Sequence, residues 1–298
     1  MPVTEVLERM GGVATRAALV RATSLRAFRA AVRAGDVVRD AHGRYALPVA
    51  EKALRRANAL TGIVSHRTAA LWWGWQVKSV PGAPDVTVRR HRKLAAGQGD
   101  GVTLHWADLR ADEVVGLVTT VDRTLTDCLR SLPFDEALAV ADSALRERSV
   151  SKTRLVQLAA GVRGPGARQA RRVAREASPL AANPFESVLR AIALDVPGLH
   201  LEPQVVIADG DGAGRTDLAD RTRRWVVEAE SHTWHSRRGA LRRDCRRYTK
   251  LVLLGWRVMR FAWEDVMFHP DYVRDCLVAA ADLSRQRADP PRTAGPAA

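Results

Sequence analysis

The chain has 298 residues, and 46% of them are hydrophobic, so it is long enough for two or three small cores and is not a disordered polymer. Its formal net charge of +14 favours a polyanion as a partner, and nucleic acid is the most common polyanion. The alternative is that the abundant Arg, Ala and Val reflect only a GC-rich genome.

The cysteines and the hydropathy of the sequence indicate the cellular compartment in which the protein is expected. Cys128, Cys245 and Cys276 are far apart and odd in number, which argues against a disulfide framework or a zinc site and suits a reducing compartment. No apolar run reaches the length of a membrane span, and the N-terminus lacks a signal peptide. We therefore expect a soluble, cytoplasmic protein that does not bind membranes.

Residues 1–50 predict a winged helix-turn-helix. Thr15 and Ser24 are suitable N-terminal caps for a second and a third helix, after a first short helix over residues 4–10. Residues 37–39 and 44–47 then predict a hairpin, which is the wing.

The third helix of this domain carries Arg26, Arg29 and Arg33 on the face opposite its apolar residues. In a winged helix this element enters the major groove of DNA while the wing touches the backbone, so we expect the three arginines to bind nucleic acid. The same fold also serves as a protein-contact or dimerisation module, which is the alternative.

The motif MGGVATRAALVRA, followed by GDVVRDAHGRYALP, resembles the N-terminal domain of the AbiEi family of type IV toxin–antitoxin antitoxins. The resemblance implies DNA binding, often at the family's own promoter, and a toxin as a second partner.

Residues 51–160 predict a small α/β support segment without chemistry of its own. Strands are expected over residues 85–88, 102–106 and 114–121, and an amphipathic helix over residues 134–145. The motifs SHRTAAL and DRTLTD are similar to the segment that follows the winged helix in AbiEi-like proteins. His66 in the first motif is expected to pack or to cap a helix rather than to catalyse a reaction.

Two segments with turn-forming and basic residues follow. GVRGPG at residues 161–166 predicts a linker. The linker and the Arg-rich helix that follows it together occupy residues 161–180. The tail over residues 287–298 lacks apolar spacing and is expected to be disordered.

Residues 181–286 predict a domain with a helix, three strands, a basic helix and a fourth strand. Asn183 caps the first helix, which has Pro184 at its first position. Strands are expected over residues 202–207, 215–220, 225–230 and 257–261. The basic helix over residues 239–254 is expected to bury Leu241, Cys245, Tyr248 and Val252 and to expose Arg242, Arg243, Arg246, Arg247 and Lys250.

The acids of these strands predict a metal site. Glu228 and Glu230 point to the same face of their strand because side chains at i and i+2 share a face. If Asp217 lies on the neighbouring strand, three carboxylates converge, and such a cluster repels itself unless a cation lies between its members. This arrangement favours Mg²⁺ or Mn²⁺ and phosphodiester chemistry.

The motifs NPFES, GRTDLAD, VVEAES, RRDCRRY and LLGWRVMRF, in this order, resemble the endonuclease-type domain allied to very-short-patch-repair (Vsr-like) enzymes. The resemblance implies a PD-(D/E)xK restriction-endonuclease-like fold in an α+β protein. It also implies that Asp217 is the central metal ligand, Glu228 the second acid and Glu186 a further contributor. His235, and less strongly His232, would act as base or at the leaving group, and Arg243 and Arg247 would hold the phosphate backbone.

One departure from the nuclease pattern concerns Glu230, which stands where the general pattern has Lys. Glu230 is expected either to bind the metal or to pair with a nearby Arg or His. The sequence therefore supports two functions: a DNA-binding protein with a Mg²⁺-dependent nuclease domain, in defence or repair, and an antitoxin or repressor whose nuclease-like domain is inactive. A third alternative is an interaction module whose basic surface docks an acidic toxin.

Overall fold

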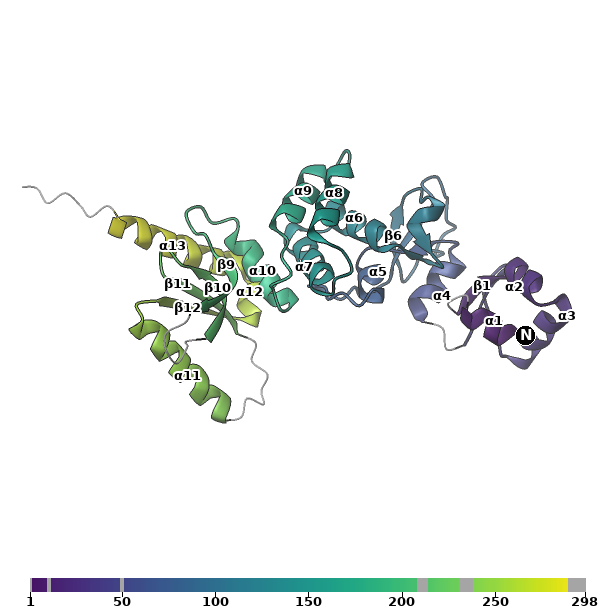
Figure 1. Ribbon diagram of the computed structural model, residues 1–298. Helices are drawn as coiled ribbons and strands as arrows, with labels where there is room; N and C mark the ends of the chain where they lie inside the picture. Colours follow the sequence, from purple (N-terminus) through teal and green to yellow (C-terminus); the bar gives the residue numbers. More distant parts are fainter. Residues whose placement is uncertain (1, 10–11, 49–50, 208–213, 231–237, 289–298) are drawn as a thin grey trace, which may run out of the picture. The chain divides into compact units, whose positions relative to one another are not determined.

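The computed structural model describes residues 2–9, 12–48, 51–207, 214–230 and 238–288. Within these residues the chain is a mixed α+β protein with three sheets, as the sequence predicts (Figure 1). Contacts divide it into two compact units, the first made of residues 1–132 and 147–175 and the second of residues 133–146 and 176–298. None of the described helices combines the length and the apolar character needed to cross a membrane.

The first unit begins with the element order expected of a winged helix. The elements are α1 (Val3–Arg9), β1 (Val13–Thr15), α2 (Arg16–Ala22), α3 (Leu25–Ala34), β2 (Val38–Ala41) and β3 (Arg44–Ala46). Both predicted caps are confirmed, because Thr15 Oγ1 accepts the Ala18 N–H at 3.0 Å and Ser24 Oγ accepts the Ala27 N–H at 3.1 Å. Strand β3 lies between β1 and β2. The core consists of Val3, Val6, Leu7, Leu19, Phe28, Val37 and Leu47.

The rest of the first unit surrounds a five-stranded sheet of order β6-β5-β4-β8-β7. Its strands are β4 (Ile63–Val64), β5 (Asp85–Val88), β6 (Thr103–Trp106), β7 (Val114–Val115) and β8 (Val118–Thr119), and its helices are α4 (Lys52–Ala59), α5 (His66–Trp72), the 3-10 turn η1 (Ala111–Glu113), α6 (Val121–Ser131), α8 (Lys152–Gly161) and α9 (Ala167–Glu176). The single strand predicted over residues 114–121 was wrong. Gly116 has φ 61°, which glycine adopts without strain, and it turns the chain into a hairpin before α6 begins.

Helix α7 (Phe134–Arg146) belongs to the second unit, although the sequence assigned it to the support segment. It packs against α10 (Pro184–Ala193), and a buried ion pair joins the two helices. Asp142 is completely buried and accepts Arg190 Nη2 at 2.6 Å, and it also accepts the Ser178 N–H at 2.7 Å. A buried charge is stable only beside its partner, so this pair ties α7 to the C-terminal unit.

The second unit is organised around a four-stranded sheet of order β12-β11-β10-β9. The strands are β9 (Glu202–Ile207), β10 (Gly214–Asp220), β11 (Trp225–Glu230) and β12 (Arg257–Ala262), and the remaining helices are α11 (Arg238–Leu253), α12 (Trp263–Phe268) and α13 (Pro270–Ala288). Strands β11 and β12 are parallel and the other pairs antiparallel. The predicted cap of α10 is confirmed, because Asn183 Oδ1 accepts the Glu186 N–H at 3.0 Å.

Helices cover both faces of this sheet (Figure 1). Leu218 and Val227 face the core shared with α10, α12 and α13, whereas Ala219 and Val226 face Leu251 of α11. The stripe predicted for α11 was wrong in part, because Cys245 is exposed and Val252 is 59% exposed. The buried side of α11 instead includes Leu251 and the partly buried Tyr248, and Leu254 packs beside them directly after the helix; the side chain of Leu241 lies outside the described part.

Candidate functional site

The second unit brings acids from two strands to one face of its sheet. Strands β10 and β11 pair from Leu218 opposite Val227 onward, and the same register places Asp217 opposite Glu228. Because side chains alternate along a strand, Asp217, Glu228 and Glu230 lie on the face that α11 covers. The strand pairing stops at this point, where Asp217 Oδ2 accepts the Ala229 N–H at 2.8 Å.

Asp217 and Glu228 are neighbours across β10 and β11, and each affects the pKa of the other. Glu228 is 4% exposed, and burial raises its pKa from 4.5 to about 7. The neighbouring carboxylates of Asp217 and Glu230 raise this pKa further, and the Arg247 guanidinium opposes them without reversing the shift. Burial also raises the pKa of Asp217. The pair is therefore a site where one carboxyl titrates near neutrality.

Glu186 approaches the same acids from the first turn of α10. Its Oε2 accepts the Ala182 N–H at 2.9 Å and Gln204 Nε2 at 2.7 Å, and its Oε1 accepts Asn183 Nδ2 at 3.0 Å. Burial raises the pKa of Glu186, and Asp217 adds to that effect. Glu186 therefore accepts hydrogen bonds at the N-terminus of α10 and also borders the pair Asp217 and Glu228.

Gln204 of β9 was not singled out by the sequence, although it lies opposite Asp217 in the register of β9 and β10. It has φ 56°, a left-handed conformation that is unfavourable for a residue with a side chain, and the regular pairing is interrupted at this position. Strained backbone of this kind persists where surrounding contacts hold it, and here the contact is with Glu186. A polar residue inside an apolar strand was the available signal.

Glu230 pairs with an arginine, which is one of the two alternatives that the sequence left open. Its Oε1 accepts Arg260 Nη2 at 2.9 Å and the Tyr248 hydroxyl, and Arg260 lies over the Tyr248 ring at 4.1 Å. Burial alone would raise the pKa of Glu230, but the Tyr248 hydroxyl and the Arg260 guanidinium hold it below its ordinary value. Tyr248 and Arg260 are further site residues that sequence reasoning missed.

Arg247 is the α11 arginine that reaches the acids. Its Nη1 lies 2.9 Å from Glu228 Oε1 and 3.4 Å from the Arg215 carbonyl oxygen, and its Nη2 donates to the Tyr248 hydroxyl at 2.9 Å. Arg243 lies exposed one turn earlier. His232 and His235 lie outside the described residues.

The donors that could hold a divalent cation are therefore the pair Asp217 and Glu228. Both are carboxylates, which suit Mg²⁺ or Mn²⁺, and they lie side by side. Both oxygens of Glu186 and Oε1 of Glu230 accept protein donors. One oxygen of Asp217 and one of Glu228 likewise accept the Ala229 N–H and Arg247. Across the described part of the chain, no group of three or more His, Cys, Asp or Glu side chains is arranged to hold a metal ion. The described residues thus fit a two-carboxylate site.

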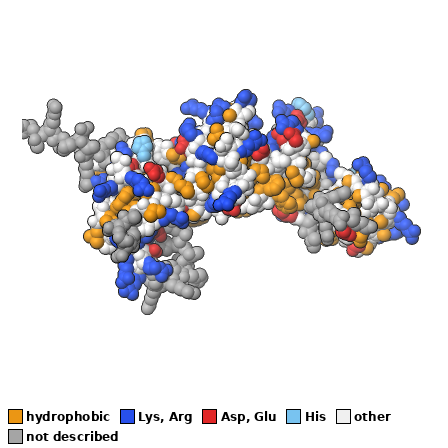
Figure 2. All heavy atoms as spheres, in the orientation of Figure 1, with side chains coloured by type: hydrophobic (Ala, Val, Ile, Leu, Met, Phe, Trp, Pro, Cys, Tyr) orange, Lys and Arg blue, Asp and Glu red, His pale blue; other side chains and the backbone are white. Residues whose placement is uncertain are grey.

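The predicted recognition helix presents its basic face to solvent. Arg26, Arg29 and Arg33 are all exposed on α3. Basic side chains also cover more of the visible face than acidic ones do (Figure 2).

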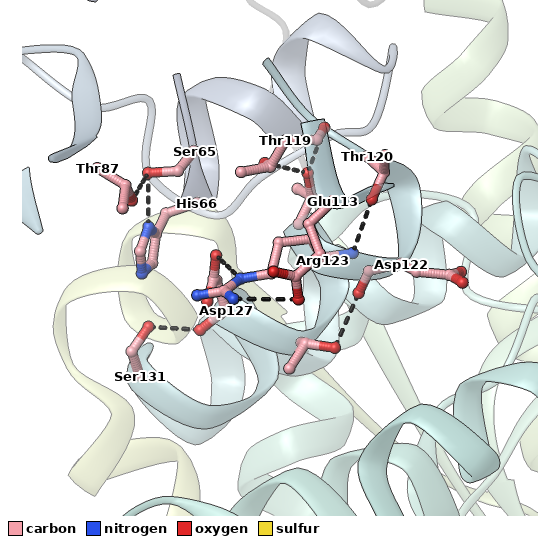
Figure 3. A network of polar contacts seen from close by, with 12 residues as sticks. Ser65, His66, Thr87, Glu113, Thr119, Thr120, Asp122, Arg123, Asp127 and Ser131 are labelled. Atoms are coloured by element: carbon pink, nitrogen blue, oxygen red, sulfur yellow. Dashed lines mark hydrogen bonds and ion pairs between the residues drawn. The ribbon is translucent and has the colours of Figure 1, made fainter. Parts of the chain in front are cut away.

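A second polar cluster lies in the first unit, around His66 (Figure 3). His66 Nδ1 lies 2.9 Å from Ser65 Oγ, and its ring stacks at 3.6 Å on His105, whose Nε2 lies 2.9 Å from Asp85. Burial lowers the pKa of His66 to about 3, and His105 adds to the effect. The ring is therefore neutral and packed, as the sequence predicts.

Arg123 lies in the same region and joins two acids (Figure 3). Its Nε donates to Asp127 at 2.9 Å and its Nη1 lies 3.2 Å from Glu113, so the DRTLTD motif ties α6 to η1. Charges that are paired in this way stabilise the arrangement of the elements that carry them.

No family model matches the chain. Two uncharacterized proteins of Mycobacterium tuberculosis, MT2308 of strain CDC 1551 / Oshkosh and Rv2248 of strain ATCC 25618 / H37Rv, are each 28% identical to it over 266 residues, which is 85% of this chain and 96% of theirs. The crystal structure of the RV2827C protein from the same species matches 63% of this chain and 78% of its own with 17% identity and a TM-score of 0.32, which is too low to carry an argument.

Proposed function

We propose that the chain is a DNA-binding protein whose C-terminal unit is a Mg²⁺-dependent nuclease that cleaves or nicks phosphodiester bonds. One observation carries the proposal: Asp217 and Glu228 are neighbours on adjacent strands, and the pKa of Glu228 is raised to about 7. Keeping two carboxyl groups together is unfavourable unless a proton or a cation is shared between them. The exposed arginines of α3 support the DNA-binding part.

The residues of the site suit distinct roles. Asp217 and Glu228 would hold the cation, which when bound activates water and offsets charge on the scissile phosphate. Arg247 would turn from Glu228 to a phosphate oxygen, because a guanidinium offers two parallel donors to either group. Glu186, which Gln204 holds through a hydrogen bond of 2.7 Å, would border the cation as a further carboxylate.

A second function is a DNA-binding repressor or antitoxin whose nuclease-like unit is inactive. The observation that favours it is the state of Glu230, which stands where nucleases of this pattern have Lys and is held by Tyr248 and Arg260. Arg247 likewise occupies one oxygen of Glu228. In this function the acid pair holds no cation, and a toxin would be a second partner.

The test is incubation of the full chain with plasmid, linear duplex and single-stranded DNA in Mg²⁺ or Mn²⁺. The nuclease proposal expects the wild type to cleave DNA and Asp217→Asn to lose at least about 100-fold in cleavage rate, which is the size of loss typical of a removed catalytic group. The control Asp275→Asn, which changes an exposed aspartate of α13, should keep full activity. Equal cleavage by Asp217→Asn and the wild type would exclude this site. Salt-sensitive DNA binding without cleavage by any of the proteins would favour the repressor or antitoxin.

A further inference from the structure

The wing of the N-terminal domain separates two hollows that share a residue. The first, of about 760 Å³, lies between α2 and the wing. The second, of about 300 Å³, lies between β2 and α4. Arg39 of β2 lines both, and its Nη2 lies 3.3 Å from His42 at the wing tip. The two hollows therefore form one surface that runs from α2 across the wing to α4.

This surface is strongly basic. Besides Arg39, the cationic lining residues of the two hollows are Arg16, Arg21, Arg44, Lys52, Arg55 and Arg56. Among the described lining residues the acid is Asp40, and it is engaged by Arg55 at 2.9 Å. The surface therefore has a clear excess of positive charge within a small area.

Arg92 of the support segment adds to this positive charge. Burial and the nearby charge of Arg92 both lower the pKa of Arg44, so the two guanidinium groups repel each other. Arg92 Nε is buried and has no hydrogen-bond partner among the described residues. Such an arrangement is relieved when an anion accepts hydrogen bonds from both groups.

The anion that fits is the phosphate backbone of duplex DNA. The first hollow is also lined by Leu25, the first residue of α3, so it adjoins the helix that carries Arg26, Arg29 and Arg33. A duplex whose major groove receives α3 would continue directly over the wing. A solvated basic face is the alternative, but it does not account for the repulsion between Arg44 and Arg92 or for the buried Arg92 Nε that has no acceptor among the described residues.

We infer that the wing, α4 and Arg92 form one phosphate-binding surface that extends the DNA contact of α3 into the support segment. This inference rests on the proposed DNA binding and deepens it. Contacts to phosphates carry no sequence information, so this surface supplies affinity and salt dependence, whereas α3 supplies sequence preference.

The test measures binding of the full chain to two 30-base-pair duplexes of different sequence by fluorescence anisotropy between 50 and 300 mM salt. The triple variant Arg39→Ala/Arg44→Ala/Arg92→Ala is expected to reduce the slope of log K against log salt by about 2 to 3, because each lost phosphate contact removes about 0.9. Affinity should fall by a similar factor for both duplexes. The control Arg168→Ala, an exposed arginine of α9, should leave the slope unchanged.

Several outcomes separate this inference from the proposed function. A slope unchanged in the triple variant, with binding reduced in Arg29→Ala, would overturn the inference and leave DNA binding intact. Absence of duplex binding by the wild type, or binding of single-stranded RNA alone, would overturn both. If the triple variant does not melt cooperatively, Lys52→Ala/Arg56→Ala on α4 provides the measurement, with an expected slope reduction of about 1 to 2.

Discussion

Substitution of Glu228 by Gln is expected to stabilise the C-terminal unit at alkaline pH. The pKa of Glu228 in the folded chain is raised from 4.5 to about 7, mainly by burial. A carboxyl whose folded pKa lies above its unfolded value contributes stability below pH 4.5, and this contribution is lost as the pH rises through 7. Above pH 7 the folded chain holds a buried, ionised Glu228 even though Arg247 lies 2.9 Å away.

The magnitude follows from the size of the shift. One pKa unit corresponds to about 1.4 kcal/mol, so ionisation of Glu228 reduces the free energy of unfolding by roughly 3 kcal/mol. Gln has nearly the same shape and carries no charge, so Glu228→Gln should gain roughly 2 to 3 kcal/mol at pH 8.5, or about 5 to 10 °C in Tm. The gain should vanish below pH 4.5, where Glu228 is protonated in both states.

The assay is urea unfolding at pH 4.5 and pH 8.5, followed by tryptophan fluorescence, which includes the buried Trp225 of the same sheet. The control is Glu202→Gln on β9, whose side chain is 65% exposed and which should change stability by less than about 0.5 kcal/mol at either pH. Under the proposed nuclease function, Mg²⁺ should stabilise the wild type and narrow its gap to Glu228→Gln, since the cation would bind the ionised pair. A wild type that is more stable than Glu228→Gln at pH 8.5 without Mg²⁺ would show that Arg247 outweighs burial, and the reasoning would fail.

Three further predictions concern stability. Gln204→Ala should lower the free energy of unfolding by about 1 to 3 kcal/mol because Glu186 loses a hydrogen-bond donor. Gln204→Gly should be about 1 kcal/mol more stable than Gln204→Ala, since Gly relieves the strain of the left-handed backbone. Urea unfolding measures both variants, and a Gln204→Ala that is more stable than Gln204→Gly would contradict this reasoning. The pKa of His66 is lowered to about 3 by burial, so the stability present above pH 6.5 should decline as the pH falls, by about 1.3 kcal/mol per pH unit near pH 5, and His66→Gln should remove that slope in pH-dependent melting. Arg190→Met should reduce stability by about 3 to 5 kcal/mol because it leaves Asp142 buried and unpaired, whereas adding Asp142→Leu should restore most of the loss in calorimetry; equal losses in the single and double variants would argue against the ion pair.

The elements that the sequence predicted well are those whose signals are local. Thr15, Ser24 and Asn183 each cap a helix through a backbone N–H three residues later. The partner is so close along the chain that tertiary packing is not needed to find it. The strands of the C-terminal sheet likewise follow from runs of apolar residues.

The candidate site was predictable only in part. Alternation along β11 places Glu228 and Glu230 on one face, whatever packs against it. The partners of Glu230, by contrast, come from α11 and β12, 18 and 30 residues away. No periodicity connects residues at such separations, so the roles of Tyr248 and Arg260 in the site emerged only from the fold.

The sequence by itself determined the caps of three helices, the excess of positive charge, and the strands that carry Asp217 and Glu228. Tertiary structure alone decided that α7 joins the second unit and that the pKa of Glu228 is raised to about 7. The physical reason is that hydrogen bonds of caps and the alternation of strands act over a few residues. Burial and the pairing of charges depend on every element that closes around a side chain.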